Sequence, residues 1–282
     1  MQDAVFPPAI LVFAASDPTG GAGLQADILT LAALGVHPLS AVTALTVQDT
    51  TGVARVASVP ADLVRQQAET LLRDIAVTAF KVGVLGSVEN AACVAEIADR
   101  HPGIPLILDP VLASGRGDVF ADAPIRAVLR EKLLPRATLV TPNLLEAYRL
   151  LEEEPPTGIL DSSAPAAMAG VAHRLIALGA RYVLITGTHA PADDVINRLY
   201  GPDGPINENR WPRLPESYHG SGCTLASAIA ACLARALARG LPHARALSEA
   251  VRQAEEYTWR ALARGFQLGS GQWLPNRFPG MD

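Results

Sequence analysis

The chain has 282 residues, of which 49% are apolar and 18% are charged, and its formal net charge at pH 7 is −5. A chain of this length and apolar content can bury a substantial core, and its acidic balance excludes the basic surface that nucleic acids and anionic membranes require. The cysteines Cys93, Cys223 and Cys232 show no Cys-X-X-Cys spacing, which argues against a disulfide framework and against a structural zinc site.

Two further absences bear on where the protein works. No stretch approaches about 18 uninterrupted apolar residues, so no transmembrane helix is expected. Residues 1–8 contain Asp3 and no basic residue ahead of the first apolar run, unlike a secretory signal. The sequence therefore predicts a cytoplasmic protein that has no nucleic-acid or membrane partner.

Apolar runs alternate with helical repeats from the start of the chain. Residues 9–15 form a continuous apolar run, which is typical of a strand buried on both faces. A glycine-rich turn follows at residues 16–23, and Leu24 begins a helical repeat that Gly35 ends. This turn is not a Walker loop, since no Gly-Lys-Ser/Thr follows it, and its spacing differs from the GxGxxG dinucleotide fingerprint.

The same alternation continues along the rest of the chain. Further strands are predicted over residues 40–47, 79–85, 106–109, 138–141 and 182–187. Further helices are predicted over residues 61–75, 88–100, 125–132, 143–151, 171–178, 223–239 and 244–264. A small antiparallel hairpin is predicted from residues 195–200 and 207–211, and the acidic, proline-rich stretch 152–165 is predicted to be a surface loop. The pattern predicts one α/β domain over residues 1–282, a doubly wound and mainly parallel sheet with helices on both faces.

Ligands of doubly wound sheets bind beyond the carboxyl ends of the strands. The polar residues that fall at these predicted ends are Asp17, Gln48, Asp109, Asn143, Glu146 and Thr186. We therefore expect them to lie along one edge of the sheet.

A second glycine turn, His219-Gly-Ser-Gly-Cys223, directly precedes a long apolar helix. The first turn of a helix has unpaired N–H groups and partial positive charge, and glycines allow several N–H groups to converge on one anion. The same field would favour the thiolate form of Cys223. The alternative is that Ser221 caps the helix and Cys223 is a small buried residue. Two glycine turns in one domain favour a phosphorylated ligand.

The carboxylates have two interpretations each. Asp109 either caps a turn or holds Mg²⁺, and Glu146 either holds the metal or complements a helix N-terminus. Asp27, one turn beyond the first glycine loop, either faces solvent or contacts a heterocycle, and Gln48 is a second candidate for that contact.

Six segments carry a resemblance to a known family. They are DPTGGAGLQAD at 17–27, TALTVQDT at 43–50, KVGVLG at 81–86, DPV at 109–111, TPNLLEA at 141–147 and HGSGCTL at 219–225. In this order they resemble the hydroxymethylpyrimidine/phosphomethylpyrimidine kinases of thiamin biosynthesis, which belong to the ribokinase-like superfamily. The resemblance extends over nearly the whole chain.

The resemblance implies an activity and a set of site residues. The activity is ATP-dependent phosphorylation of 4-amino-5-hydroxymethyl-2-methylpyrimidine and then of its monophosphate, with Mg²⁺ as cofactor and a homodimer as the assembly. Cys223 would be the base, and the anion hole would be formed by Gly220, Ser221, Gly222 and Cys223. The pyrimidine pocket would be formed by Gln48, Asp27, Val84 and Val111. The ATP side would be formed by Asn143, Thr186 and Gly187, and the metal side by Asp109 and Glu146.

Two positions depart from the family pattern, and several alternatives stay open. Ala15 stands where many relatives have glycine, and Thr186 lies in a segment where many relatives have a lysine, which leaves open a kinase competent in only one step. The alternatives are a pyridoxal or pyridoxine kinase, a non-catalytic pyrimidine-binding protein, and a cysteine hydrolase that pairs His219 with Cys223. A lid formed by residues 152–165 is a further hypothesis.

Overall fold

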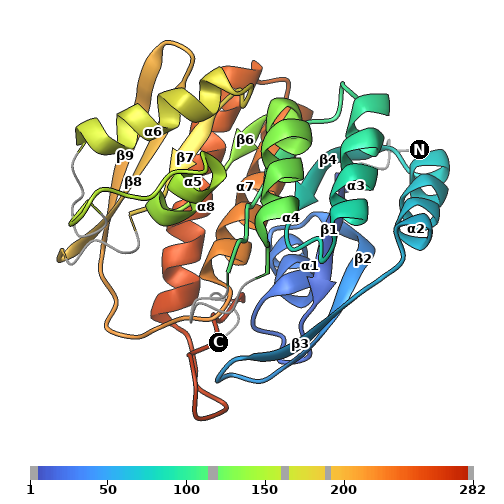
Figure 1. Ribbon diagram of the computed structural model, residues 1–282, viewed down its shortest axis with the longest axis horizontal. Helices are drawn as coiled ribbons and strands as arrows, with labels where there is room; N and C mark the ends of the chain where they lie inside the picture. The colour runs from blue at the N-terminus through green and yellow to red at the C-terminus, as the bar shows by residue number, and fades with distance from the viewer. Residues whose placement is uncertain (1–5, 114–119, 160–164, 188–191, 279–282) are drawn as a thin grey trace.

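The computed structural model describes residues 6–113, 120–159, 165–187 and 192–278 (Figure 1). Its strands form one nine-stranded sheet in the order β3-β2-β1-β4-β5-β6-β7-β8-β9. The strands are Ala9–Ser16 (β1), His37–Gln48 (β2), Val53–Ser58 (β3), Val77–Val82 (β4), Leu106–Leu108 (β5), Leu139–Val140 (β6), Val183–Ile185 (β7), Asp194–Gly201 (β8) and Gly204–Pro212 (β9).

The central part of the sheet is parallel. Strands β2, β1, β4, β5, β6 and β7 pair in parallel, whereas β3, β8 and β9 pair antiparallel at the two sides. Seven of the eight residues of β1 are buried, as a central strand covered on both faces requires. The carboxyl ends of the parallel strands therefore meet at one edge of the sheet.

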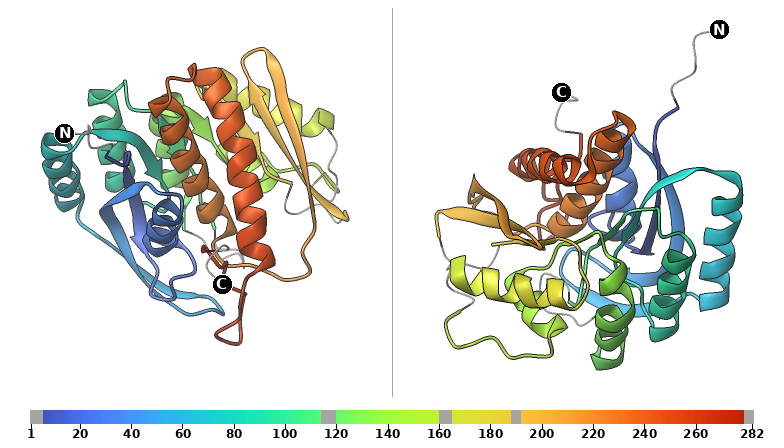
Figure 2. Two further views of the ribbon diagram at one scale, coloured as in Figure 1. Left: turned by 180° about the vertical axis from the view of Figure 1, so that it is seen from behind. Right: turned by 90° about the horizontal axis from the view of Figure 1, so that it is seen from above.

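Helices cover both faces of the sheet (Figure 2). They are Gly23–Ala33 (α1), Ala61–Asp74 (α2), Val88–Arg100 (α3), Ala123–Val128 (α4), Leu144–Leu150 (α5), Pro165–Ala177 (α6), Ser221–Ala238 (α7) and His243–Ala263 (α8). A π-helical turn, Leu129–Leu133, and a 3-10 turn, Leu134–Arg136, follow α4.

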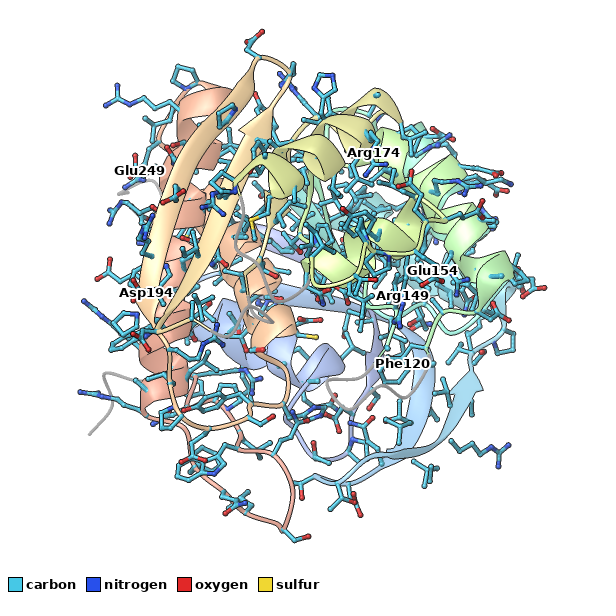
Figure 3. The ribbon with its side chains drawn as sticks, turned by 60° about the vertical axis from the view of Figure 1, so that its left-hand side comes forward. Phe120, Arg149, Glu154, Arg174, Asp194 and Glu249 are labelled. Carbon is cyan, nitrogen blue, oxygen red and sulfur yellow. The ribbon has the colours of Figure 1, made fainter. Side chains whose placement is uncertain are left out.

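Alternate residues of β1 point into two separate cores. Ile10 and Val12 pack with residues of α1, α7 and α8, whereas Leu11 and Phe13 pack with residues of α2 to α6. Charged side chains such as Arg174 on α6 lie on the outer surface of the helical layers (Figure 3). This arrangement confirms the predicted doubly wound, mainly parallel α/β fold with its antiparallel hairpin β8–β9.

Several boundaries differ from the prediction. Strand β3 was not predicted, β2 begins at His37 rather than residue 40, and α6 begins at Pro165 rather than residue 171. The helix predicted over 125–132 is a short α4 that continues as the π-helical turn. Part of the hypothetical lid, residues 160–164, lies outside the described residues.

Helix α7 is strongly apolar along its whole length. Among the described helices it is the one that is long and apolar enough to cross a membrane, and 67% of that stretch is buried inside the protein. Its apolar side chains belong to the core beside α1 and α8.

Candidate active site

The two glycine turns predicted from the sequence touch each other at the carboxyl edge of the sheet. Gly220 is the N-cap of α7 with φ +78°, and a Cβ atom there would overlap the carbonyl oxygen of Gly21. The Cys223 sulfur also accepts a hydrogen bond from the backbone N–H of Gly23. Gly220 therefore needs to be glycine, because only a residue without a Cβ atom allows this close approach.

The N-terminus of α7 has no side-chain cap. The N-cap is Gly220, with a left-handed backbone, so Ser221 is the first residue inside the helix and the alternative in which it caps the helix is wrong. In an α-helix the first N–H groups have no partner within the helix, and here no N-cap side chain accepts from them. The loop that contains Gly220, Ser221, Gly222 and Cys223 thus presents backbone donors.

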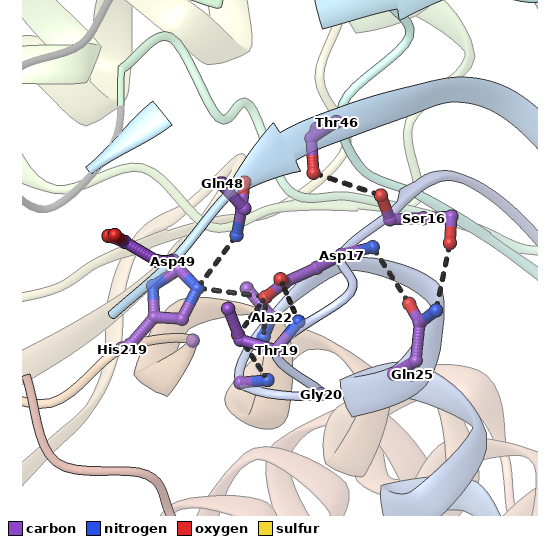
Figure 4. Close-up of polar contacts among 12 residues, drawn as sticks. Ser16, Asp17, Thr19, Gly20, Ala22, Gln25, Thr46, Gln48, Asp49 and His219 are labelled. Carbon is purple, nitrogen blue, oxygen red and sulfur yellow. Dashed lines mark hydrogen bonds and ion pairs between the residues drawn. The ribbon is translucent and has the colours of Figure 1, made fainter. Parts of the chain in front are cut away.

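Asp17 organises the first glycine turn. Its Oδ1 accepts from the Thr19 N–H at 2.8 Å, and its Oδ2 accepts from the Ala22 N–H at 2.7 Å. The Thr19 hydroxyl donates to Oδ2 at 2.9 Å, and the ring of His219 adds a fourth contact, with Nε2 at 2.8 Å from Oδ2 (Figure 4). Burial alone would raise the pKa of Asp17, but hydrogen bonds from His219 and the glycine turn outweigh it and lower that pKa.

The His219 ring does not face Cys223. It lies between Asp17 and Gln48, whose Nε2 atom is 3.1 Å from His219 Nε2, and no hydrogen bond joins His219 to Cys223 in the described part of the chain (Figure 4). The Cys–His pairing that a cysteine hydrolase needs is therefore not formed.

A buried ion pair lies beneath the start of α7. Lys81 Nζ is 2.9 Å from Asp27 Oδ1, both side chains are fully buried, and Ser227 Oγ donates to Asp27 Oδ1 at 2.6 Å. Burial alone would lower the pKa of Lys81, but its attraction to Asp27 and to the neighbouring Cys223 and Asp109 raises it. Asp27 has no exposed surface, so the direct contact with a heterocycle that the sequence suggested is not available in this structure.

Asp109 follows β5 and points towards the start of α7. It is buried, its Oδ2 lies 3.7 Å from Lys81 Nζ, and Oδ2 has no hydrogen-bond partner among the described residues. Burial raises the pKa of Asp109, although Lys81 acts in the opposite direction. A buried carboxylate oxygen without a hydrogen bond is costly, and a cation would satisfy it.

The environment of Cys223 differs from the prediction. Burial raises the pKa of its thiol to about 12, and the nearby Lys81 only partly offsets this effect. The lowered pKa expected at a helix N-terminus is therefore wrong, because the desolvation of a buried thiolate outweighs the helix field.

Asn143 and Glu146 form a capping box at the start of α5. Asn143 Oδ1 accepts from the Glu146 N–H and Glu146 Oε2 accepts from the Asn143 N–H, both at 2.9 Å. Burial raises the pKa of Glu146 to about 8. The capping alternative for Glu146 is thus realised, and one carboxylate oxygen is already committed to backbone.

Thr186 and Gly187 follow β7 and lie beside Asn143. Thr186 pairs with Asn143 in an isolated parallel bridge, so the polar ends of β6 and β7 are adjacent. The Gly187 N–H donates to Asn197 Oδ1 at 3.1 Å, and a Cβ atom on Gly187 would overlap the carbonyl oxygen of Ile196. Gly187 is therefore needed for close packing against β8, and its N–H is not free for a phosphate.

The pocket side of the site is half-exposed. Gln48, at the end of β2, and Val84 and Val111, which follow β4 and β5, all retain partial solvent exposure. All six polar residues expected at one edge lie at the carboxyl ends of the parallel strands: Gln48 is the last residue of β2, and Asp17, Asp109, Asn143, Glu146 and Thr186 follow β1, β5, β6 and β7.

Sequence reasoning missed a segment beyond α8 that supports both glycine turns. Arg277 is buried; its guanidinium donates to the carbonyl oxygen of Gly20 at 3.1 Å, to that of Gly21, and to Thr224 Oγ1 at 3.2 Å. Trp273 exchanges backbone hydrogen bonds with the segment before Gly220. No local sequence pattern connects an arginine near position 277 with a turn near position 20.

Comparison with known proteins shows which family the chain resembles. The family model described as phosphomethylpyrimidine kinase matches residues 17–276. The chain is 39% identical over 272 residues to a hydroxymethylpyrimidine/phosphomethylpyrimidine kinase of Streptomyces coelicolor, covering 95% of this chain and 93% of the relative.

The chain is also similar to solved structures of two kinds of vitamin kinase. A pyridoxal kinase from Staphylococcus aureus in complex with AMP-PCP and pyridoxal is similar with a TM-score of 0.82 and 28% identity, covering 97% of this chain and 94% of that one. A phosphomethylpyrimidine kinase from Clostridium difficile is similar with a TM-score of 0.71 and 28% identity, covering 89% and 98% of the two chains.

Proposed function

The chain belongs to the phosphomethylpyrimidine kinase family and has its ribokinase-like fold, and from this premise we propose that it makes the pyrimidine diphosphate of thiamine biosynthesis. The reaction is the transfer of a phosphoryl group from ATP to the hydroxymethyl group of 4-amino-5-hydroxymethyl-2-methylpyrimidine. A second transfer acts on the resulting monophosphate.

One observation carries the proposal. The N-terminus of α7 has no side-chain cap and touches the glycine turn of residues 20–23, so its first backbone N–H groups have no partner from an N-cap side chain. Phosphoryl transfer depends on positioning and on stabilising negative charge, which such donors supply. The loop of Gly220, Ser221, Gly222 and Cys223 is the anion hole in this proposal.

We assign to Cys223 the role of the base that accepts the proton of the substrate hydroxyl. Its sulfur lies at the first turn of α7, and Lys81 and the Gly23 N–H are the groups that favour its ionised form. As thiolate, Cys223 accepts the hydroxyl proton while the substrate oxygen bonds to the γ-phosphorus of ATP, and the bond from that phosphorus to the departing ADP oxygen breaks. Gln48 binds the pyrimidine, and Val84 and Val111 line its pocket.

The residues of the site fit a magnesium ion. Asp109 offers a buried carboxylate oxygen with no hydrogen-bond partner among the described residues, and Glu146 lies near enough for the charge of Asp109 to act on it. One or two carboxylates suffice for Mg²⁺ when phosphate oxygens complete its shell. When bound, the ion would neutralise phosphate charge. Asp109 is its proposed ligand, and Glu146 lies on the same side of the site. Asn143 and Thr186 face ATP in this proposal.

Vitamin B6 phosphorylation is the second candidate function. The similarity to a pyridoxal kinase complexed with pyridoxal supports it, because pyridoxal is also a flat heteroaromatic alcohol. A homodimer, a single domain and a cytoplasmic location belong to the proposal as expectations from the family and the sequence.

The test is steady-state ATP consumption with the hydroxymethylpyrimidine, its monophosphate and pyridoxal. We expect turnover of both pyrimidines and a fall in kcat of about two orders of magnitude in Cys223→Ala. Cys232→Ala is the matched control, since Cys232 is also buried in α7 but packs in the core. Turnover of pyridoxal alone would show that the substrate is vitamin B6 and not the pyrimidine. Full activity of Cys223→Ala would show that Cys223 is not the base.

A further inference from the structure

His219 joins the first glycine turn to the proposed pyrimidine ligand. Its Nε2 atom lies 2.8 Å from Asp17 Oδ2 and 3.1 Å from Gln48 Nε2, so one ring nitrogen serves two partners (Figure 4). The ring is largely buried, with 14% of its side chain exposed. Its place is shaped by the neighbouring turn, because a Cβ atom on Gly21 would overlap His219 Cδ2.

The position of the proton on His219 follows from Asp17. Asp17 Oδ2 already accepts from the Ala22 N–H and the Thr19 hydroxyl, and these hydrogen bonds, with that from His219, lower the pKa of Asp17. An ionised carboxylate can only accept hydrogen bonds. His219 Nε2 must therefore be the donor, and Nε2 carries a proton in both the neutral and the cationic ring.

A protonated Nε2 sets a condition on Gln48. This nitrogen has no lone pair in the ring plane, so it cannot accept from the Gln48 amino group, and two N–H donors would oppose each other at 3.1 Å. Turning the carboxamide by 180° replaces this contact with an N–H···O hydrogen bond, and the two ends of an amide have nearly the same shape. The Gln48 oxygen then faces His219, and the amino group is left for the ligand.

We propose that His219 is a positioning residue that fixes the amide orientation of Gln48, so that Gln48 presents an N–H donor to a ring nitrogen of the substrate. The site then selects heteroaromatic alcohols that have a hydrogen-bond acceptor at this position. This inference rests on the proposed function, because it takes Gln48 as the ligand of the pyrimidine.

The first experiment measures the tautomer directly. Long-range ¹H–¹⁵N NMR correlations of histidine-labelled protein distinguish Nε2–H from Nδ1–H, and the His219 signals are assigned by their loss in His219→Leu. We expect Nε2–H in the substrate-free protein. An unprotonated Nε2 would overturn the proposal, and this result does not depend on which substrate the enzyme uses.

The second experiment measures discrimination between substrates. Two pyridine analogues, each with one ring nitrogen of the hydroxymethylpyrimidine replaced by C–H, are compared with the natural ring. For one of them we expect wild type to lose about tenfold or more in kcat/KM, since a site built for a hydrogen bond rejects the analogue that lacks it. His219→Leu should lose most of this discrimination, mainly through KM for the natural substrate.

Two further variants separate positioning from folding. His219→Gln has an amino group with two donors, so it should restore part of the discrimination. His173→Leu, an exposed histidine on α6, should behave as wild type. Equal discrimination in wild type and His219→Leu, or an equal loss of kcat on every substrate with unchanged KM, would overturn the proposal. Absence of pyrimidine turnover in wild type would instead refute the proposed function, and the NMR result would still decide the tautomer.

Discussion

Lys81 is a fully buried lysine whose charge is balanced by side chains from other elements. It comes from β4, and its partner Asp27 comes from α1, 54 positions earlier in the sequence. Removing one partner of such a pair leaves the other charge buried without compensation, whereas replacing both with apolar residues is often neutral. Lys81 and Asp27 thus behave as one unit in stability.

This unit gives the first prediction. Lys81→Met alone should lower the free energy of unfolding by about 3–5 kcal/mol, and Lys81→Met combined with Asp27→Leu should recover most of that loss. Urea denaturation followed by circular dichroism measures both. Lys132→Met, at an exposed position, is the control. A double variant as unstable as the single one would show that the two residues are not coupled.

The second prediction concerns the cysteines and pH. Burial raises the pKa of Cys223 to about 12 and that of Cys232 to about 11, and it also raises the pKa of Cys93. A thiolate forms only as pH approaches the pKa, so at pH 8 roughly one Cys223 in ten thousand is ionised. Iodoacetamide should modify the folded protein very slowly at pH 8 and faster with each pH unit up to pH 10.

Mass spectrometry of the alkylated peptides provides the measurement, and protein unfolded in urea provides the control, in which all three thiols react readily. Rapid and selective modification of Cys223 near pH 7 would contradict the raised pKa. That result would instead support the lowered pKa of Cys223 that the sequence predicted.

At the residue scale, the sequence predicted which polar side chains lie at the carboxyl edge of the sheet but not their ionisation. Asp109, Gln48 and Cys223 follow local patterns, namely strand ends and a glycine turn, which can be recognised in the sequence. The pKa of Cys223 depends on burial, and the partner of Asp27 depends on the packing that places α1 beside Lys81 of β4. Neither is encoded in neighbouring residues.

At the scale of elements, the strands of the parallel sheet were predictable because their apolar runs are short, lie between turn residues and alternate with helical repeats. Strand β3 was missed because its residues are half-exposed or exposed and it exists through pairing with β2. Helix α5 shows a different limit: its capping box assigns structural work to residues that were also expected to serve ATP and the metal.

The third prediction separates these two roles for Asn143. Aspartate caps helices as well as asparagine does, so Asn143→Asp should keep the stability of the protein within about 0.5 kcal/mol. If Asn143 faces ATP phosphates, the added negative charge should raise the KM for ATP by about tenfold while the KM for the pyrimidine stays the same.

Initial rates over a range of ATP concentrations, together with urea denaturation, make this measurement. Asp122→Asn, which changes the charge of the cap of α4, is the control. An unchanged KM for ATP would leave Asn143 as a helix cap only.

At the scale of the whole molecule, the segment that follows α8 connects parts of the site that are distant in sequence. Its backbone pairs with Thr50 at the turn between β2 and β3, and Trp273 pairs with the segment before Gly220. Figure 1 shows the loop after α8 beside the end of the β2–β3 ribbon. Arg277 then holds the first glycine turn against α7.

The fourth prediction tests this support. Arg277→Met leaves three acceptors, two buried and one part-buried, without this donor, so we expect a loss of about 1–3 kcal/mol in the free energy of unfolding. We also expect kcat/KM to fall by at least about tenfold, because displacement of the glycine turn would disturb the proposed anion hole. Kinetics and denaturation are measured on the same samples, with the exposed Arg245→Met as control. Normal kcat/KM in a destabilised Arg277→Met would limit Arg277 to folding.

The contact between Arg277 and Gly21 also orders events during synthesis, because the two residues are 256 positions apart. At about 5–20 residues per second, the turn leaves the ribosome roughly 10–50 s before its arginine partner. Over that interval the nascent chain can form β1 and α1, but the turn lacks the side chain that fixes it against α7. The growing polypeptide is therefore expected to stay inert towards ATP until translation has passed α8.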